Sequence, residues 1–285
     1  MILVTGATGS VGRELMAQLA ERGETVRAMT RRPQEIHVPP GAEAVYGDAE
    51  DAESLDAAFR GADAAFLMSA QPVGSAPGPT HDLALAAAAR RAGVTRVVKL
   101  SVYDAGEGGT DPLARWHTEA EAAVTGSGLA YTLLRPGRFM TNTLGWAQMI
   151  ARGDTVYVPL SDLPTASIDP ADIAAVAAAA LTTGAHDGAA YRLTGPEVLT
   201  PVEEIEIIAK ELDRPLHAVE PPAEAMRSGM LRSGMSEEVV DAILTRMREN
   251  PPPAVVLPTV EEVLGRPATP FAEWLSRNKE RFTAA

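Results

Sequence analysis

Three glycines near the N-terminus are spaced three residues apart. Gly6, Gly9 and Gly12 lie in the segment TGATGSVG, residues 5–12, which begins at the last residue of the predicted first strand, 2–5. The first glycine permits a tight turn, the second lets the backbone approach a pyrophosphate, and the third lets the following helix pack against a sheet. Backbone N–H groups at the start of that helix face an anion, and the helix dipole favours its charge. The segment therefore predicts a loop that binds the pyrophosphate of a dinucleotide.

Two arginines follow the second predicted strand. An Asp or Glu at the end of that strand would accept hydrogen bonds from a ribose 2′-hydroxyl and repel a 2′-phosphate. The sequence has Arg31 and Arg32 there instead, and a guanidinium suits a 2′-phosphate by charge and by two-point geometry. We therefore predict NADP(H) as the cofactor, with Arg31 as the main contact. The predicted cofactor-binding residues are Gly6, Thr8, Gly9, Ser10, Val11, Gly12, Arg31, Arg32, Asp48, Met68 and Ser69.

Asp48 follows the third predicted strand, directly after Gly47. Its carboxylate would accept a hydrogen bond from the adenine amino group. An ordinary turn aspartate is the alternative.

These residues must be positioned by a sheet and its helices. The first half of the chain alternates short β-branched runs with Ala- and Leu-rich amphipathic stretches, as parallel sheets with crossover helices do. We predict strands at 2–5, 25–29, 44–46, 64–68, 97–101, 131–134, 155–158 and 190–193, and helices at 11–21, 52–59, 82–91, 113–125, 170–181 and 201–212. This alternation predicts an α/β fold with a doubly wound parallel sheet. Its candidate active-site loops follow the fourth to sixth strands, at 69–80, 101–112 and 135–142.

The pattern loosens after Pro136. We expect a dinucleotide-binding domain over 1–150, to which the segments around 155–195 return. A smaller, mainly helical α+β lobe over 196–285 would carry the substrate site. The methionine-rich part of this lobe, 222–250, is interpreted as helix packed on a neighbour, and a substrate lid is the alternative.

The composition excludes several function classes. The 285 residues include 25 Lys and Arg against 38 Asp and Glu, a net charge of −13. Nucleic acids and anionic lipids would repel such a chain, so we expect neither as a partner. Because there are no cysteines and the five histidines lack metal-ligand spacing, we predict no metal site. The start of the chain does not resemble a signal peptide and no apolar stretch approaches the roughly 20 residues of a membrane helix, so we expect a cytoplasmic protein. We also expect a small-molecule partner and a monomer or homodimer.

Several longer segments carry a family resemblance. The more specific are TGATGSVG (5–12) and LRPGRFMTN (134–142), and the others are TRRP (30–33), GD (47–48), KLSVY (99–103), HTEAE (117–121), DPADIAAV (169–176) and VEEVLGRPATPFAEW (260–274). On these the chain resembles the NmrA-like branch of the atypical short-chain dehydrogenases, which includes NADPH:quinone reductases and NADP-sensing regulators. The resemblance implies a Rossmann-type domain, a smaller C-terminal lobe, and a substrate site between them.

The candidate catalytic residues depart from the pattern of ordinary short-chain dehydrogenases. Those enzymes carry a Tyr-x-x-x-Lys pair on the helix after the fifth strand and a Ser at the end of that strand, which Ser101 matches. His117 and Glu121 stand at the spacing of the pair, on one face of the predicted helix. Either His117 donates a proton while Glu121 holds the imidazolium, or the two form only a surface pair. Tyr103 is the other candidate acid, and Lys99, inside the strand, is interpreted as structural.

The missing Tyr/Lys pair bears on the substrate. Reduction of an isolated ketone creates a localised alkoxide that needs a positioned acid, whereas a hydroquinone anion is delocalised and water can protonate it. Bound NADPH and a flat apolar pocket then suffice, because orienting two reactants itself lowers the barrier. Phe139, Asn142 and Trp146 are the candidate substrate-binding residues. Core packing is the alternative for the two aromatic residues.

Three functions therefore remain open. The first is an NADPH-dependent oxidoreductase that transfers a hydride to a quinone or to a quinone-like or polyketide carbonyl. The second is a non-catalytic NADP(H)-binding regulator that senses redox state. The third is a nicotinamide-dependent ketoreductase or epimerase of secondary metabolism. We favour the first because the glycine loop is intact and the C-terminal lobe is roomy.

Overall fold

The computed structural model of the chain describes residues 1–106, 111–232, 235, 237, 240–241, 243–245 and 254–283. The chain forms two compact units, each made of three stretches. The first unit holds Met1–Pro136, Pro170–Leu193 and Thr259–Gly265, and the second holds Gly137–Asp169, Thr194–Pro258 and Arg266–Ala285. Neither unit is one continuous piece of chain.

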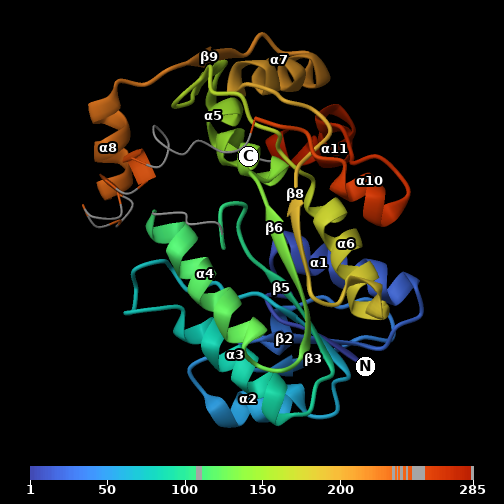
Figure 1. Cartoon of the computed structure of the whole chain (residues 1–285). Helices are drawn as coiled ribbons and strands as arrows, with labels where there is room; N and C mark the ends of the chain where they lie inside the picture. Colours follow the sequence, from blue (N-terminus) through green and yellow to red (C-terminus); the bar gives the residue numbers. More distant parts are fainter. Residues whose placement is uncertain are drawn as a thin grey trace. The chain divides into compact units, whose positions relative to one another are not determined.

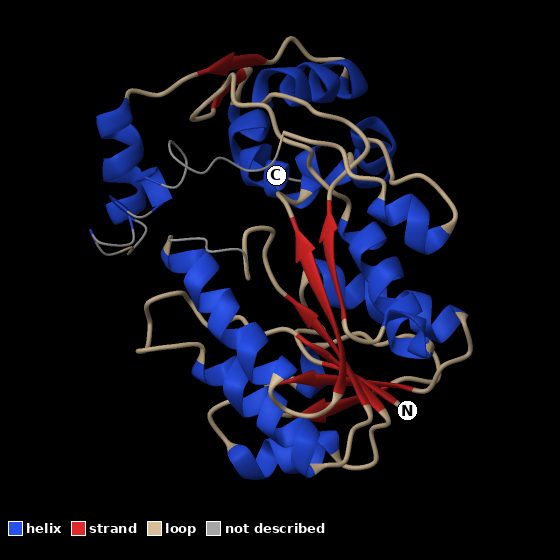
Figure 2. Cartoon of the chain, in the orientation of Figure 1, coloured by secondary structure: helices blue, strands red, loops and turns tan. Residues whose placement is uncertain are grey.

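The first unit is built on a seven-stranded parallel sheet (Figure 1, Figure 2). The strands are β1 (Ile2–Val4), β2 (Val26–Thr30), β3 (Glu43–Tyr46), β4 (Ala64–Leu67), β5 (Arg96–Leu100), β6 (Ala130–Pro136) and β8 (Ala189–Leu193). Their order is β3-β2-β1-β4-β5-β6-β8, and every neighbouring pair is parallel. Because parallel strands end at the same edge of a sheet, the loops that follow them meet there.

Helices cover both faces of this sheet (Figure 1). On one face lie α2 (Ala52–Phe59), α3 (Thr80–Arg91) and α4 (Pro112–Thr125); on the other α1 (Ser10–Glu21) packs against α6 (Pro170–Thr182), which also contacts α10 (Thr259–Leu264). Asp51 and Asp111 begin α2 and α4, because each side chain accepts hydrogen bonds from two backbone N–H groups of the first turn. This architecture confirms the predicted α/β fold.

The core between the sheet and α2 and α3 is apolar. It includes Leu55 and Phe59 from α2, Leu85 from α3, and Leu3 and Leu67 from the sheet. Full burial of such a side chain contributes about 1.5–3 kcal/mol. This packing fixes the strand ends that carry the candidate site.

The second unit combines short helices with a two-stranded parallel sheet. Its elements are the 3₁₀ segment η2 (Met140–Trp146), α5 (Ala147–Arg152), β7 (Thr155–Tyr157), α7 (Pro201–Leu212), β9 (His217–Val219), α8 (Ala223–Arg232), α11 (Phe271–Asn278) and α12 (Glu280–Thr283). In its core the Phe271 and Trp274 rings stack at 5.5 Å, and Phe282 meets Trp274 edge-on at 6.3 Å. Aromatic pairs in these geometries add stability beyond their buried area. The second unit thus has a core of its own.

The observed elements follow the predicted ones closely, and the two units differ from the expected ranges. Every predicted strand and helix boundary lies within two residues of the observed one. Gly137–Asp169 belongs to the second unit, although it was expected in the first domain, because residues just after β6 pack into the core of the second unit. Of the segment 155–195 that was expected to return to the first domain, 170–193 does so. Conversely, 259–265 packs in the first unit. Of the methionine-rich part, α8 is helical, but much of 233–250 lies outside the described residues, so the choice between packed helix and lid stays a prediction.

Two findings concern membranes and metals. No helix in the described ranges combines the length and the apolar character needed to span a bilayer. Within the same ranges, no group of three or more His, Asp or Glu side chains is placed to hold a metal ion.

Glu204 is a buried carboxylate in the second unit. It lies in the first turn of α7 and is fully buried. One of its carboxylate oxygens accepts hydrogen bonds from Arg138 Nη1 at 2.5 Å and from Ser167 Oγ at 3.1 Å. Burial raises the pKa of Glu204, and Arg138 and Ser167 offset only part of that effect.

We expect Glu204→Gln to remove part of the pH dependence of folding. A carboxyl whose pKa is higher in the folded than in the unfolded state loses stability as the pH rises from its unfolded value, about 4.3, through its folded value. Gln cannot ionise, so the variant does not lose this stability. The difference in free energy of unfolding, variant minus wild type, should therefore increase as the pH rises from about 5 to about 8, as urea unfolding would measure. Identical profiles for the two proteins would contradict this.

The neighbouring Glu203 provides the matched control for this experiment. Hydrogen bonds from the backbone and side chain of Thr200 lower the pKa of the exposed Glu203. The stabilisation that Glu203 provides is therefore lost as the pH falls below the pKa that Glu203 has in the unfolded chain. This pH dependence has the opposite sign to that of Glu204. We expect Glu203→Gln to leave the slope between about pH 5 and pH 8 unchanged.

Candidate active site

The glycine loop runs from the end of β1 into α1. Gly6 has a φ of +61°, and a Cβ at this position would lie 2.4 Å from the sulfur of Met68, so the turn favours glycine. A Cβ on Gly12 would lie 2.3 Å from the carbonyl oxygen of Gly6. Among the described residues, no side chain caps α1, and its first turn has no acid. The first N–H groups of the helix can therefore face an anion.

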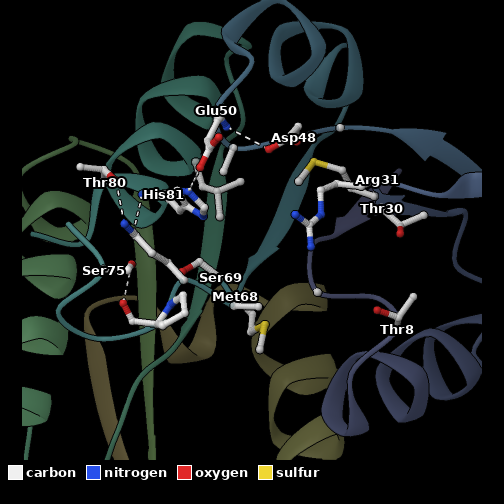
Figure 3. A pocket seen from close by; sticks show the side chains of 18 of the residues that line it. Thr8, Thr30, Arg31, Asp48, Glu50, Met68, Ser69, Ser75, Thr80 and His81 are labelled. Carbon is white, nitrogen blue, oxygen red and sulfur yellow. Dashed lines mark hydrogen bonds and ion pairs between the residues drawn. The ribbon is translucent and has the colours of Figure 1, made fainter. Parts of the chain in front are cut away.

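A cavity of about 880 Å³ opens beside this loop (Figure 3). Its walls come from the ends of β1, β2, β3 and β4, from the loop after β4, and from the start of α3. It is lined by Gly6, Thr8, Met29, Thr30, Arg31, Gly47, Asp48, Ala49, Glu50, Met68, Ser69, Ala70, Gln71, Pro72, Ser75, Ala76, Thr80, His81 and Leu85. All of these residues belong to the first unit.

The two predicted arginines lie differently. The side chain of Arg31 extends toward the middle of the cavity (Figure 3). Arg32 does not line the cavity; its side chain is 73% exposed and forms an ion pair with Glu35 at 2.8 Å. The last residue of β2 is Thr30, so no acid stands at the position where a ribose 2′-hydroxyl would be recognised. Of the two arginines, Arg31 is the one that lines the cavity, and its contact with a 2′-phosphate stays a prediction.

Asp48 lines the cavity and also builds a turn. Its side chain accepts a hydrogen bond from the backbone N–H of Glu50 at 3.1 Å, and its own N–H donates to Ser54 Oγ at 2.9 Å. A Cβ on the preceding Gly47 would lie 2.5 Å from the Met29 side chain. Both interpretations of Asp48, adenine acceptor and turn residue, are compatible with this placement.

Several cavity residues were not singled out by the sequence. His81 Nε2 lies 3.2 Å from Glu50 Oε1 (Figure 3). Gln71 accepts a hydrogen bond from the His81 backbone at 3.0 Å and donates to Thr80 at 2.8 Å. The sequence did predict a binding loop at 69–80, from its position after the fourth strand, and Gln71, Thr80 and His81 lie in or next to that loop. The contact between His81 and Glu50 could not be predicted, because the two residues are 31 positions apart and form no local pattern.

Ser101 and Glu121 are brought together, with an arginine that sequence reasoning missed. Ser101 Oγ donates to Glu121 Oε1 at 2.5 Å. Arg135, at the end of β6, donates to both oxygens of Glu121, at 3.0 and 2.7 Å. Glu121 is 4% exposed and Ser101 is also 4% exposed, so the cluster is buried. The charge of Glu121 is thus balanced by Arg135 in a two-point ion pair.

The other two candidate acids lie in the same unit. His117 is half-buried on α4, one turn before Glu121. Tyr103 follows β5, and the guanidinium of Arg192 lies 4.7 Å from the centre of its ring. Arg192 also donates to the Tyr103 carbonyl oxygen at 3.3 Å. A cation over the ring face restrains this tyrosine.

The three candidate substrate-binding residues lie in the second unit. Phe139 is half-buried and bridges to Ile168, and Asn142 is exposed. Trp146 is only 8% exposed, belongs to the core of the unit, and has Arg138 at 5.8 Å from its ring. Trp146 therefore has the packing role that was its alternative interpretation, and a substrate contact for any of the three stays a prediction.

The cavity fits a dinucleotide. Its volume lies within the range of about 300–1,000 Å³ of small-molecule sites. The glycine loop keeps its close turn only with glycine, since a Cβ at Gly6 would collide with Met68 and a Cβ at Gly12 with the Gly6 carbonyl oxygen. One cationic side chain, Arg31, extends into the cavity at the strand end where a 2′-phosphate would lie.

Two relatives match this chain over nearly its full length. A reductase of (4-alkanoyl-5-oxo-2,5-dihydrofuran-3-yl)methyl phosphate from Streptomyces griseus is 41% identical over 286 residues, 99% of each chain. An NAD(P)H azoreductase from Xenophilus azovorans is 35% identical over 291 residues, 100% of each chain.

The fold and the family are shown by two further comparisons. The NADPH complex of an Escherichia coli NADPH-dependent quinone oxidoreductase has a TM-score of 0.79, at 24% identity over 97% of this chain and 99% of that one. The profile of the NAD(P)H-binding family matches residues 6–184. Because that match covers more than half of the sequence, the chain belongs to the NAD(P)H-binding family.

Proposed function

We propose that the protein transfers a hydride from NADPH to a conjugated, electron-poor small molecule, of which quinones and aromatic carbonyls are examples. The protein is an NAD(P)H-dependent oxidoreductase, the class of its relatives; the proposal concerns the cofactor preference and the acceptor. We place it in the cytoplasm, as a monomer or homodimer.

The observation that carries the acceptor class is the Ser101–Glu121–Arg135 cluster. Glu121 occupies the position at which ordinary short-chain dehydrogenases have a lysine, and its carboxylate is ion-paired with Arg135. The hydroxyl proton of Ser101 points to Glu121 and not to a substrate. In this arrangement neither Ser101 nor Glu121 supplies a proton. An acceptor that takes up a hydride as a delocalised anion has the least need of one.

Of the residues that would hold the cofactor, Gly6, Arg31 and Asp48 line the cavity, and Gly9 and Gly12 belong to the loop beside it. The loop of Gly6, Gly9 and Gly12 and the N-terminus of α1 would bind the pyrophosphate. Arg31 would bind the 2′-phosphate, and Asp48 the adenine side. When bound, the reduced nicotinamide supplies the hydride. The chain's part is then to orient the two reactants and exclude water, which is worth several kcal/mol on its own.

The relatives' names support the same acceptor class. An oxo-dihydrofuran bearing an alkanoyl group and an azo compound both contain a π system that delocalises added charge. The E. coli protein that shares the fold is a quinone oxidoreductase. Electron-poor conjugation is the property these compounds share.

We expect the candidate acids to matter little for such an acceptor. Tyr103→Phe and His117→Ala should slow hydride transfer to a quinone by less than about tenfold, whereas loss of a true general acid costs about 10²–10⁴-fold. Single-turnover oxidation of bound NADPH, followed by its absorbance, measures this step directly. A hundredfold loss in either variant would contradict the proposal and favour the ketoreductase or epimerase alternative.

The function itself is tested by anaerobic NADPH oxidation with a panel of quinones, unsaturated lactones and azo compounds, with NADH in parallel. Turnover with NADPH preferred is the expected result. Tight NADPH binding without turnover of any acceptor would overturn the proposal and leave the redox-sensing regulator as the better account.

A further inference from the structure

A buried charged pair lies directly behind the wall of the cavity. Lys99, on β5, is 1% exposed, and Asp82, in the first turn of α3, is 3% exposed. Lys99 Nζ lies 3.0 Å from Asp82 Oδ1 and also donates to the Leu100 carbonyl oxygen. The other oxygen of Asp82 accepts the hydroxyl proton of Ser69 at 2.9 Å.

Fold stability does not account well for this pair. Removing two charges from water is costly, and buried ion pairs can often be replaced by apolar side chains without loss of stability. Neither residue lines the cavity or takes part in the function proposed above. The pair does, however, join the start of α3 to β5, and through Ser69 it also reaches the loop after β4.

The only one of the three residues that reaches the cavity is Ser69 (Figure 3). Its hydroxyl has one proton, which Asp82 accepts. Toward the cavity Ser69 therefore offers lone pairs only, and it can accept a hydrogen bond but not donate one. A carboxylate acceptor held by a lysine makes this orientation firm, because hydrogen bonds to charged groups are the stronger ones.

The neighbours of Ser69 indicate which donor it meets. Met68, next to it, packs against Gly6, at the loop where the pyrophosphate would bind. The groups attached directly to a dinucleotide's pyrophosphate are its two riboses, whose free hydroxyls are donors. Ser69, one residue after Met68, lines the cavity beside that loop, and a ribose hydroxyl is the class of donor that a bound dinucleotide would offer there.

We infer that Ser69 accepts a hydrogen bond from a ribose hydroxyl of the bound dinucleotide, and that Asp82 and Lys99 are positioning residues that keep its proton turned away from the ligand. This rests on the proposed use of NADPH. The role is an orientation effect, so it should appear in the dissociation constant of NADPH and not only in turnover.

Two isosteric substitutions test the first half of this inference. Ser69→Thr keeps the hydroxyl and Ser69→Val removes it, at nearly equal volume. We expect the dissociation constant of NADPH, titrated by its fluorescence, to stay within about twofold for Thr and to rise about five- to tenfold for Val, the size of one hydrogen bond. Equal constants for the two variants would overturn the inference.

A second pair of variants tests the positioning residues. In Asp82→Asn/Lys99→Met the amide oxygen can still accept the Ser69 proton, whereas in Asp82→Leu/Lys99→Met nothing replaces that acceptor. We expect the Asn pair to bind NADPH within about twofold of wild type, and the Leu pair to lose about as much as Ser69→Val. Adding Ser69→Val to the Leu pair should then cost less than about twofold more, because the two changes remove one interaction.

A purely structural role gives a different result. It would lower the melting temperature of the Leu pair and leave its NADPH dissociation constant unchanged, which would overturn the positioning role. A fivefold loss in the Asn pair would overturn it too. If wild-type protein binds NADPH but reduces no acceptor, the proposed function fails while this inference can still hold. If wild type binds no NADPH, both fail.

Discussion

Arg31→Ala should weaken NADPH binding about thirtyfold while changing NADH binding by less than about twofold. Arg31 extends into the cavity at the end of β2, where the ribose 2′-position would lie. A charge-assisted hydrogen bond to a phosphate is worth about 2 kcal/mol, which corresponds to that factor. NADH has a hydroxyl in place of the phosphate, so it has little to lose. Fluorescence titration of both cofactors at one ionic strength measures the difference.

The adjacent arginine provides the matched control. Arg32 is paired with Glu35 and does not line the cavity. Because an exposed pair contributes little, we expect Arg32→Ala to change NADPH binding by less than about threefold. Equal losses of NADPH and NADH in Arg31→Ala would mean that Arg31 does not contact the 2′-phosphate.

The second large effect is expected at Gly12. A Cβ there would lie 2.3 Å from the Gly6 carbonyl oxygen and 2.9 Å from Ala7 Cα, both backbone atoms that cannot rotate away. Gly12→Ala should therefore force α1 off the loop, lower the free energy of unfolding by about 1–3 kcal/mol, and weaken NADPH binding at least tenfold. Urea unfolding and cofactor titration on the same preparation check both effects.

Gly229 is the control for a glycine-to-alanine change. It lies in α8, and a Cβ there would meet no atom within 4 Å. Alanine is about 0.5–1 kcal/mol more favourable than glycine in a helix, so Gly229→Ala should keep or slightly raise stability and leave NADPH binding unchanged. Wild-type binding by Gly12→Ala would show that the loop tolerates a side chain and that its glycines are not there for close approach.

The fold was predictable because its signals are local. The alternation of β-branched runs with amphipathic stretches marks the strands and the helices α1, α2, α3, α4 and α6 of the first unit, and the glycine loop marks where β1 meets α1. It did not mark α10, which lies far along the chain from the rest of its unit. The three-residue strand β9 has no such signal: His217–Val219 is too short for a period of two to show, and it pairs with β7, about sixty residues earlier.

The candidate site was predictable only in part, because its charge pairs are tertiary. His117 and Glu121 share a helix face, so the sequence pairs them, but the guanidinium that binds Glu121 comes from Arg135 on β6. The β5–β6 register and the packing of α4 bring these groups together. Likewise, Trp146 has the residue type of a binding pocket and the burial of a core. The residue type alone does not distinguish a tryptophan that binds substrate from one that packs in a core.

The interleaving of the two units constrains how such a protein can change over evolution. The chain passes from one unit to the other five times, since each unit is assembled from three stretches. No single crossover between genes can exchange one whole unit for another, as happens with domains joined end to end. The last stretch of the first unit, 259–265, is also made late in synthesis, so neither unit is complete on the ribosome until most of the chain has emerged. An exchange of one unit between related reductases would therefore have to transplant all three of its stretches together.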